Sequence, residues 1–235
     1  MKSLAEQSVT ELGGRLSVLT RQKRDHVKLD RLLQQLEAAG PEQQDAVLRR
    51  IYRLVFPHAF AEESVLWPTL RRTLPDGPHL TLQIEQEHQE VNELVTSLEQ
   101  LPVQSPERQA TLRRLVEVLR EDVRDEEDQL LPRLQAAAST SQLRRLGLAW
   151  ELVRRIAPTR AHPVVARRPP GNVIAAAPLS IVDRLRDAVD YRLQHSPTRD
   201  HRVLQGVSLK LRMVAHRIEH LPMMTRGEDP STHRV

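Results

Sequence analysis

The sequence predicts an all-α protein, organised as an up-down antiparallel four-helix bundle with extra helices after it. Glycine is scarce, with 8 residues among 235, while Leu, Arg, Glu and Gln recur at helical spacing. Alternating β-branched residues, which would indicate strands, are nearly absent from the first 156 residues. Proline and glycine divide these residues into long segments joined by short turns, as in a helical bundle.

These breaks define the helices in order. Gly40-Pro41 ends the first helix, the run 74–78 ends the second, and Pro102 to Pro106 separates the third from the fourth. Ser105-Pro106 is typical of an N-cap followed by proline at the first helical position. The expected helices cover residues 15–39, 41–73, 79–101 and 106–137, with a fifth at 141–156 and two more at about 180–194 and 201–221.

The last third of the chain differs in charge from the rest. Residues 1–156 carry 22 Lys and Arg against 24 Asp and Glu, whereas the last 79 residues carry 13 against 7. We expect a bundle with its flanking helix at 1–156, a Pro/Arg-rich linker or strap at 157–178, a helical extension at 179–221 and a disordered polar tail at 222–235. The extension would cover the bundle or form a homodimer contact. Nucleic-acid binding is not expected, because no aromatic-rich binding strip accompanies the basic residues.

Composition excludes several classes of site. The chain has no cysteine, so disulfides, thiolate zinc sites and iron–sulfur clusters are excluded, and a metal must be bound by His, Asp or Glu. The first residues lack the apolar core of a signal peptide, and the longest apolar stretch, 173–182, is interrupted by Pro178. We therefore expect a cytoplasmic protein without membrane contact.

An internal repeat is the most informative feature of the sequence. Residues 25–38 (DHVKLDRLLQQLEA) align with 87–100 (EHQEVNELVTSLEQ), and 58–70 (HAFAEESVLWPTL) align with 122–134 (DVRDEEDQLLPRL). Five of the thirteen positions in the second pair are identical. Two copies of a helical hairpin predict a bundle with pseudo-twofold symmetry.

The repeat also aligns residues that can bind a metal. The aligned pairs are His26 with His88, His58 with Asp122, and Glu62 with Glu126. A rise of about 1.5 Å per residue, counted from each turn, places a ligand from every helix near one height. His58 and Glu62 are spaced i, i+4 among apolar neighbours, as are Asp122 and Glu126, so both pairs should face the interior.

Burying three imidazoles and three carboxylates would be costly without a counter-charge. Two divalent cations supply it. Two Fe²⁺ carry one more positive charge than the three carboxylates carry negative charges, so a small anion could bind as well. Imidazole with carboxylate suits iron, with manganese as the alternative, and di-iron carboxylate proteins build such sites inside four-helix bundles.

At this point the chain resembles the hemerythrin-like (HHE cation-binding) domains. The resemblance covers about residues 15–137 and rests on His26 in DHVKLDRLL, HAFAEESVLWP from His58, His88 in EHQEVNEL, and DVRDEEDQLLP from Asp122. It implies an up-down four-helix bundle around two non-haem irons, without haem. It further implies that His26 and His58 bind one iron and His88 the other, with Glu62 and Glu126 bridging.

The chain departs from the family pattern at several positions. Asp122 stands where the fourth motif normally begins with His, and Ile84 and Asn92 stand where oxygen carriers have a second His near His88. Such a harder donor set should lower the iron potential and disfavour reversible O₂ carriage. Glu85, three residues before His88, is a further candidate ligand.

Other polar and aromatic residues near the motifs receive simpler interpretations. Glu63, Glu87, Glu127 and Asp128 should lie on solvated faces and have no chemical role. Phe60 would shield an iron-bound ligand from water, because it lies near His58 and Glu62 in sequence.

The sequence predicts a non-haem di-iron protein that binds, senses or reduces a small oxidant, which the family resemblance identifies as O₂, H₂O₂ or NO. Enzyme status stays open, because no acid–base residue is identifiable; turnover would be of the catalase, peroxidase or NO-reducing type. The alternatives are an iron- or oxygen-responsive regulatory module without turnover and a metal-free helical scaffold.

A second motif lies near the C-terminus. Residues 216–220 (HRIEH) match the inverted zinc-protease signature, with His216 and His220 one turn apart. The region is too short and too interrupted by proline to build a protease. A helix that carries two histidines, or an incidental surface metal site, explains the motif better.

Overall fold

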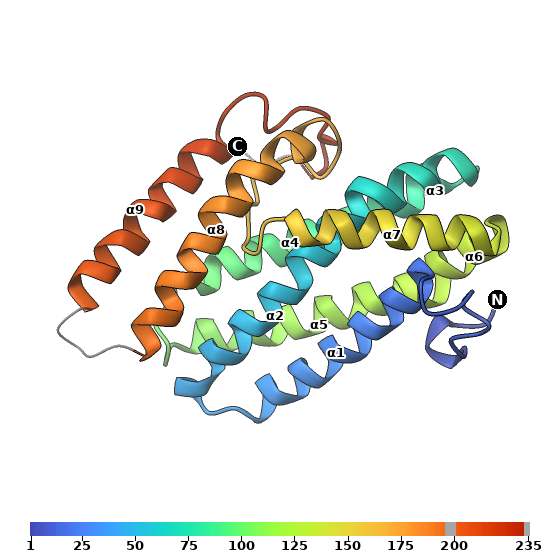
Figure 1. Ribbon diagram of the computed structural model, residues 1–235. Coiled ribbons are helices and arrows are strands. Elements are labelled where there is room, and N and C mark those ends of the chain that lie inside the picture. The colour runs from blue at the N-terminus through green and yellow to red at the C-terminus, as the bar shows by residue number, and fades with distance from the viewer. Residues whose placement is uncertain (196–200, 233–235) are drawn as a thin grey trace.

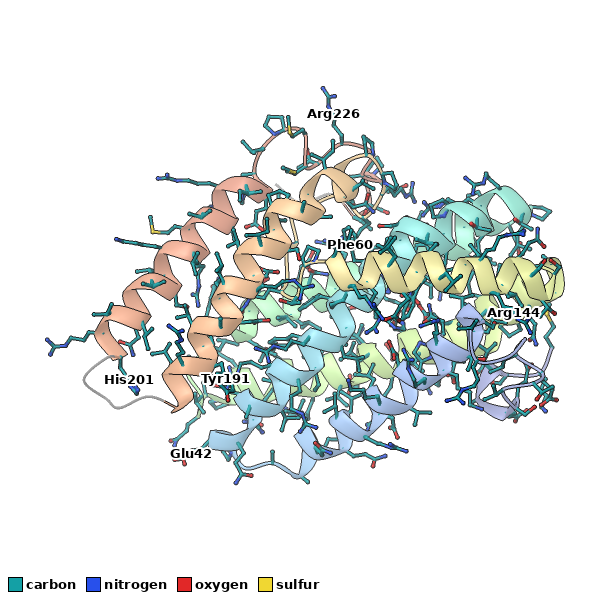
Figure 2. All side chains as sticks on the ribbon, in the orientation of Figure 1. Glu42, Phe60, Arg144, Tyr191, His201 and Arg226 are labelled. Atoms are coloured by element: carbon teal, nitrogen blue, oxygen red, sulfur yellow. The ribbon has the colours of Figure 1, made fainter. Side chains whose placement is uncertain are left out.

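The computed structural model describes residues 1–195 and 201–232, and within these ranges it contains helices and no strand (Figure 1). The prediction of an all-α protein is therefore confirmed. Two helical hairpins, at residues 18–73 and 77–137, pack against each other and correspond to the two copies of the repeat. A further pair of long helices lies beside them, as Figure 1 shows and Figure 2 repeats with the side chains drawn.

Both hairpins have the same order of elements. The first consists of α1 (Val18–Ala38), α2 (Pro41–Ala61), the π-helical turn η2 (Glu62–Leu66) and α3 (Trp67–Thr73). The second consists of α4 (Gly77–Leu98), α5 (Pro106–Asp125), the π-helical turn η3 (Glu126–Leu130) and α6 (Leu131–Ala137). Each long segment expected at 41–73 and 106–137 is thus interrupted by one π-helical turn.

The helix ends follow from local sequence. The Ser17 hydroxyl accepts a hydrogen bond from the Leu19 amide at the start of α1, and Ser105 caps α5 through the Arg108 amide. Each π-helical turn is followed by a proline, Pro68 or Pro132. Because proline has no amide hydrogen to donate to the preceding turn, the wider π-helical turn accommodates it.

Two apolar clusters fill the hairpins at different heights. One contains residues from the ends joined by the short turns, such as Leu33, Ile51, Val95 and Leu115. The other lies toward the opposite end and includes Trp67. The positions of the predicted ligands fall between these two clusters along every helix, so the fold places the polar residues in a layer enclosed by apolar side chains.

Helix α7 (Thr140–Ile156) covers one side of the hairpins, against α1 and α2. Gly147 permits this approach, since a Cβ atom there would lie 2.1 Å from the Leu16 carbonyl oxygen. Trp150 of the same helix is fully buried. Residues 1–17 contain the short 3-10 turn η1 (Leu4–Glu6), and Leu4 and Leu12 join the second apolar cluster.

The C-terminal part differs from expectation in two places. Helix α8 (Gly171–His195) begins earlier than predicted, so residues 171–178 of the expected linker are helical. Burial of Ala175 and Leu179 against α9 (His201–Glu219) offsets the hydrogen bond lost at Pro178. We call the remaining residues, 157–170, the strap.

The expected disordered tail also contacts the strap over its described part, residues 222–232. The Ala166 amide donates to the Met224 carbonyl at 2.9 Å, and the Gly171 amide donates to the Arg226 carbonyl at 3.0 Å. Residues 233–235 of that tail, and 196–200 between α8 and α9, lie outside the described residues. Among the described helices, none has both the length and the apolar composition needed to span a bilayer.

Candidate metal centre

The structure brings together the six side chains that the repeat singled out. They form two groups in which one ligand atom from each residue lies within 4.8 Å of the others. One group is His26, His58, Glu62 and Glu126, and the other is His88, Asp122 and Glu126. Because Glu126 belongs to both groups, the two groups are adjacent parts of one buried centre.

Nitrogen and carboxylate oxygen atoms in this centre lie close together, but not in the geometry of hydrogen bonds. His26 Nε2 is 3.1 Å from Glu126 Oε2, and His58 Nε2 is 3.1 Å from Glu62 Oε1. Yet His26 Nε2, both oxygens of Glu62 and both oxygens of Glu126 are buried without a hydrogen-bond partner. Buried polar atoms are rarely left in this state. Atoms directed at a shared cation would show this geometry, so the residues present fit a metal centre.

The other ring nitrogen of each histidine faces a carboxylate. His26 Nδ1 lies 2.8 Å from Glu127, His88 Nδ1 lies 2.9 Å from Glu63, and His58 Nδ1 lies 3.6 Å from Asp25. A carboxylate can only accept here, so Nδ1 carries the proton and Nε2 is directed into the centre. Histidines that bind metals are oriented by carboxylates in the same way.

The assignment of Glu63 and Glu127 to solvated faces was wrong. Glu63 is 2 % exposed and Glu127 is 9 % exposed, and each bonds a histidine of the other hairpin. The prediction assumed that each regular helical turn directs one of these residues inward. A π-helical turn contains more residues than a regular turn, so two successive residues can face inward. The sequence signal was present, because the Glu-Glu pair is identical in both copies of the repeat.

Arginines approach two of the carboxylates that face the histidines. Arg154 of α7 lies 3.8 Å from Asp25, and Arg167 of the strap lies 3.9 Å from Glu63. Arg24 lies nearer to Asp25, at 3.1 Å, and Arg154 also lies 3.2 Å from Glu151. Two of the carboxylates that face the histidines therefore have arginine neighbours as well.

Titration of the centre is dominated by burial and by the proximity of its groups. Burial and the charge of Glu126 raise the pKa of Asp122 well above its usual range. Burial lowers the pKa of His88, but Asp122 and Glu63 outweigh this effect and raise that pKa to about 10. Without a cation, bound protons therefore reduce the repulsion between these groups. A metal would have to displace those protons in order to bind.

Two further candidates from the sequence lie elsewhere. Glu85 is fully buried, but its carboxylate is held by Arg71 and by Arg168, whose Nε lies 2.8 Å from Oε2. Phe60 lines a separate space beneath the strap rather than the cavity at the centre. Two other aromatic rings lie beside the ligands. Trp150 meets His58 edge-on at 5.3 Å between ring centroids, and Trp67 stacks on His88 at 6.4 Å. Periodicity gave no signal for the contact of Trp150, because Trp150 belongs to another helix.

A small cavity of about 20 Å³ adjoins the centre. Its polar wall is formed by Asp25, His26, His58, His88 and Asp122, and its apolar wall by Leu29, Leu54, Val55, Ala59 and Val123. This volume holds roughly one water-sized molecule. The side chains therefore leave only a small space beside the ligands.

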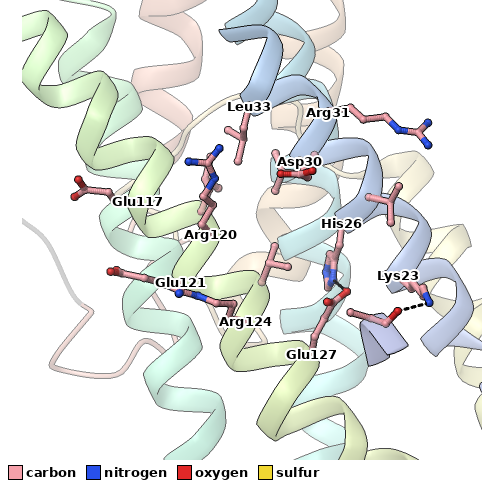
Figure 3. A pocket seen from close by; sticks show the side chains of 15 residues that line it. Lys23, His26, Asp30, Arg31, Leu33, Glu117, Arg120, Glu121, Arg124 and Glu127 are labelled. Atoms are coloured by element: carbon pink, nitrogen blue, oxygen red, sulfur yellow. Dashed lines mark hydrogen bonds and ion pairs between the residues drawn. The ribbon is translucent and has the colours of Figure 1, made fainter. Parts of the chain in front are cut away.

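An open groove of about 520 Å³ between α1 and α5 approaches the same cavity. Figure 3 shows the hydrogen-bonded pair His26 and Glu127 at its wall, with Lys23, Arg120 and Arg124 around it. His26, Leu29 and Val123 line both the groove and the inner cavity. These three side chains are thus the boundary between the centre and the surface.

Repeated helical hairpins that direct imidazoles and carboxylates into one buried centre define a helical cation-binding protein. The profile described as the hemerythrin HHE cation binding domain matches residues 17–134, half of the chain. The chain belongs to this family, as the sequence motifs predicted, and hemerythrin-like domains bind metal ions.

Two relatives show how far the similarity extends. An uncharacterized hemerythrin-like protein of Schizosaccharomyces pombe is 25% identical over 171 residues, covering 71% of this chain and 83% of that protein. A DNA nickase of Nostoc sp. is 28% identical over 119 residues, covering 50% of this chain and 33% of the nickase. No solved structure matches the chain.

Proposed function

We propose that the chain is a non-haem di-iron protein that binds, senses or reduces a small oxidant: O₂, H₂O₂ or NO. Its ligands would be supplied by an up-down four-helix bundle made of the two hairpins. The observation that supports this most directly is the set of buried ligand atoms of His26, Glu62 and Glu126 that lack hydrogen-bond partners. Such atoms are costly to bury unless a cation satisfies them.

The two groups suggest how the ligands divide. His26 and His58 would hold one iron, and His88 and Asp122 the other. Glu126 belongs to both groups, and Glu62 places one oxygen 3.1 Å from His58 Nε2 and the other 3.7 Å from His88 Nε2, so both carboxylates suit a bridging role. Iron bound there would supply one-electron redox chemistry and positions open to a small ligand.

The surrounding residues restrict what can react. Leu29, Leu54 and Val123 form the apolar side of the cavity, whose volume of about 20 Å³ suits a small ligand such as O₂, NO or H₂O₂ better than an organic substrate. The groove between α1 and α5 is the expected route of entry. The protein's contribution is thus to hold the ligands and to favour a small reactant.

Metal analysis with optical spectroscopy tests the proposal. After anaerobic reconstitution with Fe²⁺ we expect two irons per chain and spectral changes on adding O₂, H₂O₂ or NO. Glu62→Ala should bind at most one iron, because it removes a bridge. Asp128→Ala is the matched control, since Asp128 is exposed in the π-helical turn that contains Glu126. Iron content near zero in the unaltered chain would favour the metal-free scaffold.

A role in sensing without turnover is favoured by one specific contact. Arg167 of the strap reaches Glu63, which orients His88, so the centre is linked to the chain segment that leads to α8. Hydrogen exchange in α8 and α9, measured with and without iron, tests this role. Exchange that slows on iron binding, without consumption of peroxide, supports a sensor; unchanged exchange together with turnover supports an enzyme.

A further inference from the structure

The last turn of α9 and the residue that follows it carry a second group of ligand-bearing side chains, far in sequence from the centre described above. His216, Glu219 and His220 each offer one ligand atom, and these atoms lie within 4.8 Å of one another. We propose that these three residues bind one divalent transition-metal ion of the Zn²⁺ class. His216 and Glu219 are spaced i, i+3 in the last turn of α9, so they share one face of the helix, and His220 directly follows it.

The histidine His220 is in the tautomer that would bind a metal through Nε2. Its Nδ1 lies 2.7 Å from the His216 carbonyl oxygen and 3.9 Å from Glu219 Oε1. A carbonyl can only accept a hydrogen bond, so Nδ1 carries the proton and Nε2 keeps its lone pair. This is the arrangement in which metal-binding histidines are commonly held.

Glu219 is held in place by a buried histidine of the strap. His162 is 6 % exposed, and its Nδ1 lies 3.0 Å from Glu219 Oε2. The other carboxylate oxygen, Oε1, lies 3.3 Å from His216 Nδ1. Ligands about 2.0–2.1 Å from a tetrahedral zinc are separated by about 3.4 Å, so this pair needs little movement to bind one ion.

His162 is itself fixed from two other elements. Its Nε2 lies 3.2 Å from Asp183 of α8, and its backbone amide donates to the Asn92 side chain of α4 at 3.0 Å. Glu219 is therefore anchored to the rest of the molecule through the strap. A carboxylate oriented in advance loses less conformational entropy on binding a metal than a free surface side chain.

The surroundings determine the kind of ion. Two nitrogens and one oxygen suit Zn²⁺, Cu²⁺ or Ni²⁺ rather than Ca²⁺ or Mg²⁺, which prefer oxygen ligands. The site borders a groove of about 530 Å³, so water can fill the remaining coordination position. Of the arginines that line this groove, Arg186 and Arg212 each lie 3.8 Å from Glu99, which offsets part of their charge.

Zinc titration of the full iron-loaded chain tests the proposal. We expect one Zn²⁺ per chain beyond the iron, with an affinity at least tenfold weaker in the double variant His216→Ala/His220→Ala. Both histidines are exposed, so that variant should fold, and its iron content should equal that of the unaltered chain. His79→Ala, which removes an isolated exposed histidine of α4, is the matched control and should leave zinc binding unchanged.

Two results would overturn the assignment. Equal zinc affinity in the double variant and in His79→Ala would show that the ion binds elsewhere. Unchanged affinity in Glu219→Gln would show that the carboxylate is not a ligand. Loss of zinc binding with normal iron content separates this site from the proposed di-iron centre, which fails or succeeds independently.

Discussion

At the scale of single residues, the two halves of the centre differ at one pair of aligned positions. Asp25 faces His58 in the first half, and the repeat aligns Glu87 with Asp25 and Asp122 with His58. The second half therefore keeps the outer carboxylate but has lost the histidine that it would orient. Burial and the charge of Asp125 raise the pKa of Glu87 to about 7, and the charge of His88 opposes this rise only in part.

This comparison predicts the effect of Asp122→His. We expect the variant to retain two irons, because the new imidazole would have Glu87 as its outer partner; Glu87 is near enough for its charge to raise the pKa of Asp122. Iron content and the optical spectrum measure the outcome. Adding Glu87→Ala to Asp122→His should weaken iron binding about 10-fold or more. A variant that loses its iron through Asp122→His alone would show that Asp122 has a role that histidine cannot fill.

Glu63 provides a second prediction at this scale. Glu63→Ala should leave all six inner ligands in place but weaken metal binding on the His88 side by about 10- to 100-fold, because His88 loses the partner that orients its ring. Isothermal titration or competition with a chelator measures this change. Asp128→Ala serves as control, and a loss of the same size in that variant would mean that charge alone explains the effect.

At the scale of elements, the two π-helical turns position carboxylates of both hairpins in the centre. Each turn supplies one inner carboxylate, Glu62 or Glu126, and the next residue supplies the outer carboxylate for a histidine of the other hairpin. The two hairpins thus exchange carboxylates reciprocally. Neither hairpin can complete the histidine orientation alone, so we expect metal binding to require both.

Helix packing around the centre predicts opposite effects for two glycines. Gly147→Ala should destabilise the protein by about 1–3 kcal/mol, because the added Cβ would overlap the backbone at Leu16 and separate α7 from α1. Gly206→Ala, in α9, should stabilise it by about 0.5–1 kcal/mol, because nothing lies within 4 Å of the added atom. Urea unfolding measures both. Equal effects of the two substitutions would contradict the close contact at Gly147.

At the scale of the whole molecule, apolar clusters above and below the centre set the cost of leaving it without a cation. Glu62 is fully buried, and burial together with the charge of Glu126 raises its pKa. A cation that binds the folded chain and not the unfolded one stabilises it by about 2.7 kcal/mol at one hundred times its dissociation constant. Metal occupancy and global stability should therefore be linked.

Metal removal tests this link. Chelation should lower the thermal midpoint of unfolding, and adding back iron should restore it. The variant His58→Ala/Glu62→Ala should show little or none of this response, because it lacks two inner ligands. A midpoint that responds equally in the variant and in the unaltered chain would place the stabilising metal outside the centre.

The sequence alone determined the helices, the duplicated hairpin and the six residues that meet between the apolar clusters. Helical periodicity and a repeat are local properties, so both can be counted along the chain. Periodicity and the repeat could also locate the ligands. In antiparallel helices joined by a short turn, residues equally far from the turn lie side by side.

Only the tertiary structure decided what surrounds those six residues. The partners of His88 and His26 come from the other hairpin, Arg167 comes from the strap, and Glu219 is held by His162, 57 residues away in sequence. Such contacts depend on how elements pack and on the widened spacing of the π-helical turns. Periodicity along one helix does not reveal how that helix packs against others, because it describes only which face of that helix is apolar. It does not reveal a π-helical turn either, because it assumes a regular helical repeat.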